Sequence, residues 1–229
     1  MADLSLLEKT IGADFKNKDL LKESLTHRSY LNENPHWPLP NNERLEFLGD
    51  AVLELIVTEY LFSRFPKYVE GQLTSLRAAL VNYQMLSQVA KNNSLENYIL
   101  LSKGEAKDTA RAKEVILADT FEALIGAIYL DQGYEETKDF IKRSVLSNLK
   151  EVIEQNLYSD PKSRLQEIVQ EQLKVTPTYK VLKEFGPDHQ KTFLIGVFYN
   201  EKLIAEGEGL SKQEAECQAA EKALKGMEE

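Results

Sequence analysis

The stretch NNERLEFLGDAVLE, from Asn41 to Glu54, combines acidic and apolar residues at the spacing of an α-helix. The acidic side chains recur every three or four residues, at Glu43, Glu46, Asp50 and Glu54. At 100° per residue they fall in a narrow stripe on one helix face, where like charges repel one another. The ordinary interpretation of such a stripe is a solvated outer face, and the alternative is a site for a bound cation.

Two further features favour the bound cation. Gly49 interrupts the predicted helix at a cost of roughly 1 kcal/mol relative to alanine, which indicates that another group approaches the backbone beside Asp50. The second feature is the stretch ADTFEALIGA, residues 118–127, which places Asp119 and Glu122 one turn apart among small and apolar residues. Buried carboxylates are costly unless they are paired or bind a cation, and residues 117–131 contain no lysine or arginine.

Small residues in the second segment would let the two helices pack closely enough to bring four carboxylates together. These carboxylates belong to Glu46, Asp50, Asp119 and Glu122. An all-oxygen set suits Mg²⁺ or Mn²⁺ rather than zinc. Since Mg²⁺ commonly completes its shell with phosphate oxygens, the pattern indicates phosphoryl chemistry.

Residues 43–51, ERLEFLGDA, resemble the signature of ribonuclease III, the double-stranded-RNA endonuclease, and DTFEAL at 119–124 resembles its second catalytic segment. The resemblance extends over nearly the whole chain. It implies an Mg²⁺-dependent phosphodiester hydrolase in which Asp50 and Glu122 are catalytic and in which they hold the metal together with Glu46 and Asp119. It also implies products with 5′-phosphate and 3′-hydroxyl ends and a role in rRNA and mRNA processing.

The same resemblance implies a homodimer, because a staggered cut of a duplex needs two sites. Phe47 matches the aromatic residue that inserts into the partner subunit, and we expect it to anchor the dimer. Glu43 and Glu70 are expected to be secondary active-site residues, the latter within EGQLT at 70–74. For Glu70 the alternative is structural, because an acidic residue in a first turn stabilises a helix through its dipole.

Composition sets further limits. Aspartate and glutamate exceed lysine and arginine by 37 to 28, a formal net charge of −9, which is the wrong sign for a protein that binds nucleic acid through its overall field. A local basic strip or bound metal could still serve that purpose. The single cysteine, Cys217, excludes an internal disulfide, and residues 1–15 have no apolar run that would form a signal peptide or membrane span. We therefore expect a cytoplasmic protein with no membrane partner.

The periodicity of apolar residues predicts a first domain made of helices. The expected helices are 4–11, 19–25 with Asp19 as the N-cap, 41–65, 70–91, 114–131 and 134–156. His27 is expected to make structural hydrogen bonds, while the loop at 35–40 should pack Trp37 onto the body of the protein. The polar stretch 104–113, with four cationic residues in or beside it, is either a solvated loop or a phosphate contact.

Residues 156–163 mark the expected domain boundary, with Ser159 or Asp160 as an N-cap, which gives a first domain at 1–157 and a second at 158–229. In the second, a helix at 161–173, strands at 178–185, 191–199 and 202–208, and a helix at 211–227 give the order α-β-β-β-α. Five residues of the last helix form its expected buried stripe: Ala215, Ala219, Ala220, Ala223 and Leu224. The fold class is therefore multidomain, an all-α domain followed by an α+β domain.

That element order, with strings such as GPDH at 186–189, resembles the double-stranded-RNA-binding domain, which recognises A-form RNA by its shape. The resemblance implies that four residues contact RNA: Gln166, Gln170, His189 and Lys212. The family usually has a lysine pair where this chain has Lys212 and Gln213. Two rival interpretations are a non-cleaving double-stranded-RNA-binding protein and a dinuclear phosphatase. The first would be expected to have lost one of the four acids, and the second would normally bring histidine ligands.

Overall fold

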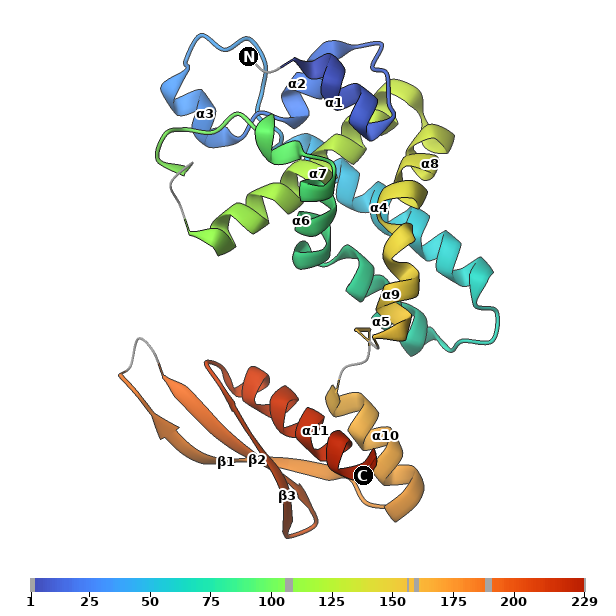
Figure 1. Cartoon of the computed structure of the whole chain (residues 1–229), viewed down its shortest axis with the longest axis vertical. Helices are drawn as coiled ribbons and strands as arrows, with labels where there is room; N and C mark the ends of the chain where they lie inside the picture. Colours follow the sequence, from blue (N-terminus) through green and yellow to red (C-terminus); the bar gives the residue numbers. More distant parts are fainter. Residues whose placement is uncertain (1–2, 106–108, 156, 159–160, 188–190, 229) are drawn as a thin grey trace. The chain divides into compact units, whose positions relative to one another are not determined.

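A computed structural model describes residues 3–105, 109–155, 157–158, 161–187 and 191–228. The chain divides into two compact units, Met1–Tyr158 and Ser159–Glu229 (Figure 1). Each unit has its own cluster of buried apolar side chains. No helix among the described residues is long and apolar enough to cross a membrane.

The first unit is helical, and its core forms around two long helices, α4 and α7. Its α-helices are α1 (Leu4–Ile11), α2 (Lys18–Ser24), α3 (Arg28–Glu33), α4 (Glu43–Arg64), α5 (Glu70–Val81), α6 (Tyr83–Asn92), α7 (Ala110–Gln132), α8 (Tyr134–Ser144) and α9 (Leu149–Glu154), with short 3-10 turns η1 (Leu95–Asn97) and η3 (Leu146–Asn148). Helix α7 packs against α2, α4, α6 and α8. Because neighbours cover it on several sides, residues 123–128 are all buried, as expected for a helix inside a core.

Side-chain caps explain most departures from the predicted helices. The predicted helix 70–91 is two helices, since Asn82 is extended (ψ 157°) and its side chain accepts a hydrogen bond from the Met85 N–H at 2.9 Å. The predicted helix 134–156 also breaks, because the Asn148 amide donates to the Ser144 and Val145 carbonyls, both at 3.0 Å. Such side-chain bonds satisfy the free ends of a helix and so favour its termination.

The beginning of the chain contains two further corrections. Asn17, not Asp19, caps α2, because its side chain accepts from the Asp19 N–H. Helix α3 was not expected, and His27 caps it by accepting from the Ser29 N–H at 3.2 Å. The prediction that His27 makes structural hydrogen bonds is confirmed. Trp37 packs edge-on against Tyr30, with ring centroids 5.3 Å apart, so it lies against the protein as predicted.

The second unit places two helices on one face of a small antiparallel sheet. Helix α10 (Pro161–Leu173) is followed by β1 (Pro177–Phe185), β2 (Thr192–Tyr199), β3 (Lys202–Gly209) and helix α11 (Lys212–Glu228), and the strand order is β1-β2-β3 (Figure 1). Ile195 and Val197 of β2 are buried, and the predicted stripe of α11 is buried throughout. The predicted N-cap at Ser159 or Asp160 lies outside the described residues.

Candidate functional site

The site forms where α4 and α7 approach each other through their backbones. A Cβ atom added at Gly49 would lie 1.7 Å from the Glu122 carbonyl oxygen. Across the same contact, a Cβ at Gly126 would lie 2.2 Å from the Leu45 carbonyl oxygen. These distances are far shorter than any real contact, so only glycine fits at either position. The group that approaches the backbone beside Asp50, as Gly49 predicted, is therefore the backbone of Glu122 itself.

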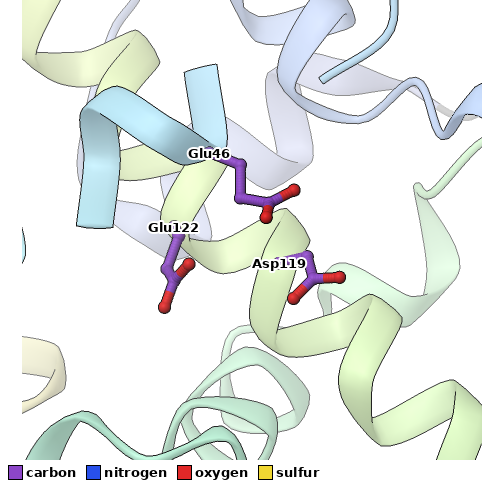
Figure 2. Close-up of side chains that lie close together, drawn as sticks. All are labelled: Glu46, Asp119 and Glu122. Atoms are coloured by element: carbon purple, nitrogen blue, oxygen red, sulfur yellow. The ribbon is translucent and has the colours of Figure 1, made fainter. Parts of the chain in front are cut away.

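This contact brings carboxylates from two distant segments together. Glu46 of α4 and Asp119 and Glu122 of α7 each offer a carboxylate oxygen, and these oxygens lie within 4.8 Å of one another (Figure 2). All three side chains are half-buried. Figure 2 shows the three side chains close together where the helices meet, with Glu46 on α4 and Asp119 and Glu122 on α7. Three carboxylate oxygens at this spacing can coordinate a single hard cation.

The electrostatics of the cluster are unfavourable for anions. Burial, followed by repulsion from Asp50, Asp119, Glu46 and Glu54, raises the pKa of Glu122 to about 8. Burial and the neighbouring carboxylates, Asp119 foremost, also raise the pKa of Glu46, and burial raises that of Asp119. Desolvation and like charges both disfavour the ionised form. The cluster is therefore arranged to be stabilised by positive charge.

Asp50 stands at the edge of this cluster. It lies one turn after Glu46 on α4, is exposed, and is not one of the three grouped carboxylates. It is nevertheless the charged neighbour that acts most strongly on the pKa of Glu122. Asp50 therefore lies beside the three grouped carboxylates, close enough for its charge to act on Glu122.

The flanking acids of α4 are paired with cations on the surface. Glu43 lies 3.6 Å from the Arg28 guanidinium, and Glu54 lies 3.9 Å from that of Arg77. The described residues show no such ion pair for the three clustered acids. Glu54 belonged to the acidic stripe in the sequence but was not among the predicted metal ligands, and its charge helps to raise the pKa of Glu122. Its spacing of four residues from Asp50 places both on one face of α4, and this spacing could have identified Glu54 as a neighbour of the cluster.

Two other predicted residues lie apart from the cluster. Phe47, next to Glu46, is 82% exposed, so it takes no part in the core of one subunit. Glu70 begins α5, accepts a hydrogen bond from the Thr74 hydroxyl at 3.0 Å, and lines a surface pocket with Thr58. Thr58 is twelve residues beyond Glu46 on α4, which corresponds to about 18 Å along the helix. The structure of one chain does not bring Glu70 to the three acids.

Three of the four predicted RNA-contacting residues lie on the helices of the second unit. Gln166 and Gln170 are exposed on α10. Lys212 begins α11 with its ammonium 5.6 Å from the Phe193 ring centre and 3.9 Å from Glu184. His189 lies outside the described residues, as does Lys107 of the polar stretch 104–113, so their placement stays a prediction. The expectation of a loop was wrong for the end of that stretch, because Arg111 and Lys113 belong to the first turn of α7.

Comparisons with known proteins agree with both units. A family model described as Ribonuclease-III-like matches residues 17–149, and the double-stranded RNA binding motif matches residues 161–227. The chain is 44% identical to Ribonuclease 3 of Borreliella afzelii over 100% of its length and 93% of that protein. It is also 44% identical to Ribonuclease 3 of Enterococcus faecalis, over 96% of each chain.

Among solved structures, the nuclease domain of ribonuclease III from Campylobacter jejuni superposes with a TM-score of 0.58 and 44% identity. The match covers 64% of this chain and 98% of that one. That structure is described as flexible in a region involved in dimer formation. The matched part corresponds in extent to the helical unit that carries the acidic cluster.

Proposed function

Because this chain belongs to the ribonuclease III family, we propose that it is an endoribonuclease that hydrolyses phosphodiester bonds in double-stranded RNA. The observation that carries the proposal is the cluster of Glu46, Asp119 and Glu122 between α4 and α7. A non-cleaving protein of the same fold is not favoured, since nothing would then maintain a cluster of acids whose charges repel. Histidine ligands of the kind that a dinuclear phosphatase normally uses are absent from the cluster as the described residues form it.

The residues present fit a divalent ion. The donor set consists only of carboxylate oxygens. Burial and like charges raise the pKa of Glu122, so a cation at the cluster would stabilise the ionised carboxylates. Glu46, Asp119 and Glu122 would hold the ion, with Asp50 beside them. Mg²⁺ is the expected ion, with Mn²⁺ as a substitute, because hard cations prefer oxygen ligands. When bound, such an ion would supply charge stabilisation at the phosphate and favour deprotonation of water.

Two carboxylates and the glycine contact between the helices have proposed roles in this chemistry. Asp50 and Glu122 are the proposed catalytic residues, because Asp50 is exposed at the edge of the cluster and is the charged neighbour that acts most strongly on the pKa of the half-buried Glu122. The glycine contact between the helices fixes the two sides of the site relative to each other, and rigid placement of reacting groups is a large part of catalysis. Cleavage is proposed to leave 5′-phosphate and 3′-hydroxyl ends, and the substrates to be rRNA and mRNA precursors in the cytoplasm.

A homodimer would supply the two sites that a cut through both strands needs. Phe47 is the proposed anchor, because it is an aromatic side chain 82% exposed in the single chain and such residues commonly dominate interfaces. Glu43 and Glu70 are proposed as secondary residues of the assembled site. We assign residues 1–157 to the nuclease domain and 158–229 to RNA binding.

In the second domain we propose that Gln166 and Gln170 of α10, His189 and Lys212 contact the duplex. The helical surface offers exposed amides on α10 and a cation at the start of α11. Amide groups can bond to 2′-hydroxyls in the minor groove. A lysine at a helix N-terminus adds its charge to the helix dipole at a phosphate.

One experiment tests the nuclease proposal directly. A uniform RNA duplex and the same strand without its complement are incubated with the protein in Mg²⁺ or in EDTA, and the products are resolved on a denaturing gel. The expected result is cleavage of the duplex in Mg²⁺ alone. Equal cleavage of the single strand would overturn the substrate class, and equal cleavage in EDTA would overturn the metal requirement.

A further inference from the structure

The second unit has a sheet face that its own helices do not cover. Because Ile195 and Val197 point into the core below α11, the alternating residues of β2 point to the opposite, outer face. These residues are Leu194, Gly196 and Phe198. We call this surface the outer sheet face. It lies on the side of the sheet away from the helices that carry the proposed RNA-contacting residues.

An apolar cluster occupies the middle of the outer sheet face. A Cβ at Gly196 would lie 2.6 Å from a Leu203 methyl, 2.9 Å from the Phe198 ring and 3.1 Å from a Leu182 methyl. Side chains from all three strands therefore converge over this glycine. Leu182 and Leu203 are each 41% exposed, so the cluster presents apolar surface to solvent.

Charges on either side of this cluster are segregated by sign. In one row across the sheet, Lys180 of β1 pairs with Gly196, which pairs with Glu206 of β3. In a second row, Lys183 pairs with Leu194, which pairs with Glu208. The β1 edge of the outer sheet face is therefore cationic and the β3 edge anionic.

These four charges are not paired with one another among the described residues. The lysine and glutamate of a row are two strands apart, about 10 Å. The described residues show no ion pair for any of the four. The Lys180 ammonium lies 5.1 Å from the Phe198 ring centre and that of Lys183 lies 5.8 Å from the Phe185 ring centre. Both ammonium groups are thus held over the outer sheet face.

We propose that the outer sheet face binds the same face of a second copy of this chain, about a two-fold axis parallel to the strands. That rotation exchanges the β1 and β3 edges while each row keeps its position along the strands. Lys180 of each copy then faces Glu206 of the other, and Lys183 faces Glu208. A two-fold axis perpendicular to the strands would instead place lysine over lysine. The surface is self-complementary about one axis only, as a closed dimer contact requires.

The dimensions of the face suit a weak contact. Stacked sheets lie about 10 Å apart, which facing lysine and glutamate side chains can span together. Three strands of about eight residues cover about 400 Å² per copy, so the contact buries about 800 Å² in total, at the weak end of specific interfaces. It operates when two copies are already held close, within one dimer or side by side on one duplex, because proximity raises their effective concentration.

Cross-linking tests the contact in the full-length protein. Leu194 lies in the central strand, next to the proposed axis, so Leu194→Cys in a Cys217→Ser background places two thiols opposite each other. A short bismaleimide should join two chains, and a denaturing gel would show the covalent dimer. Glu221→Cys, on the exposed side of α11, is the matched control. Cross-linking through residue 194 should be several-fold faster, and equal rates at the two positions would overturn the proposal.

Charge exchange then tests the pairing. Lys180→Glu with Lys183→Glu, or Glu206→Lys with Glu208→Lys, should lower cross-linking to the control rate, because either change leaves one sign on the whole face. The fourfold exchange restores complementarity at an unchanged net charge and should restore cross-linking. All four residues are exposed, and circular dichroism would verify that each variant is folded. Undiminished cross-linking in the double variants, or no restoration in the fourfold variant, would overturn the proposal.

Discussion

Both units contain a glycine against which a helix backbone packs. In the nuclease unit, Gly49 meets the backbone of Glu122, and in the RNA-binding unit, Gly207 of β3 meets α11, where an added Cβ would lie 2.2 Å from the Ala215 carbonyl oxygen. The α11 contact is lined by buried alanines such as Ala215 and Ala219, whereas the α7 contact carries carboxylates at its edge. At the α11 contact, close packing brings only apolar side chains together. At the α7 contact, the same close packing also brings together carboxylates that repel one another.

Filling these two glycine contacts should have the largest effect. Gly49→Ala forces α4 and α7 apart, and we expect a loss of about 3 kcal/mol in the free energy of unfolding, together with loss of cleavage. Gly207→Ala should destabilise the RNA-binding unit by a similar amount and leave the nuclease unit folded. Urea unfolding followed by circular dichroism would measure both. Gly71→Ala is the control, because its Cβ meets nothing within 4 Å; a Gly49→Ala protein as stable as this control would contradict the described helix contact.

Removing one charge from the acidic cluster should separate catalysis from stability. Glu122→Gln keeps the side-chain volume but removes a proposed metal ligand. We expect the variant to lose several kcal/mol of transition-state stabilisation, which lowers the cleavage rate about a hundredfold or more. Duplex binding and dimerisation should be largely unchanged. Cleavage rates in Mg²⁺ and binding in EDTA would be measured side by side. A variant that cuts at nearly the wild-type rate would show that the cluster is not the active site.

The exposed aromatic residue beside the cluster should matter for assembly. Phe47→Ala is expected to weaken the dimer by about 2 kcal/mol, because truncation of an anchoring aromatic leaves its partner pocket unfilled. Analytical ultracentrifugation over a dilution series would measure the dimer population. Leu6→Ala, at another exposed apolar residue of the nuclease unit, is the control and should leave it unchanged. An unaltered dimer in the Phe47→Ala protein would remove this residue from the interface.

The repulsion within the cluster should make the stability of the nuclease unit depend on pH, whereas the described acids of the RNA-binding unit form no such cluster. The pKa of Glu122 is raised from 4.5 to about 8, so between these values the folded state binds a proton that the unfolded state does not. In EDTA, stability should therefore be highest at low pH and fall as pH rises through about 8. Melting temperatures from pH 5 to 9 would show this slope. Mg²⁺ should flatten this slope by favouring the ionised carboxylates. Glu122→Gln should also flatten it, because the variant has no carboxyl group to titrate at this position. Identical slopes for the wild type in EDTA, the wild type in Mg²⁺ and the variant would refute the assignment of the slope to Glu122.

The smallest expected effect concerns the charge of the RNA-binding unit. Gln213 is exposed beside Lys212, while the neighbouring Glu214 carboxylate accepts a hydrogen bond from the Leu210 N–H at 2.8 Å and so belongs to the helix start. Gln213→Lys should add one phosphate contact and steepen the plot of log K against log salt by about one unit, alike for unrelated duplexes. Fluorescence anisotropy across a salt series would measure it. An unchanged slope would place Gln213 away from the RNA backbone.

The sequence alone was sufficient for features that depend on local periodicity. The acidic stripe of α4, the second acidic segment in α7 and the buried stripe of α11 follow from the spacing of side chains along one helix. The cost of a glycine within a helix likewise predicted a close approach at Gly49. The breaks at Asn82 and Asn148 were not predicted, because these side chains compete locally with a helical pattern that continues on both sides of them.

Tertiary structure alone decided how segments far apart in the chain are aligned. It grouped Glu46 with Asp119 and Glu122 and left Asp50 at the edge. The reason is that the contact between Gly49 and Gly126 sets how far α4 is shifted along its axis relative to α7. It also placed lysines and glutamates in rows across the sheet, because irregularities between Val181 and Lys183 and between Val197 and Phe198 shift the strand register. Periodicity fixes the face on which a residue lies, whereas its neighbours on other elements depend on packing distances that no single segment encodes.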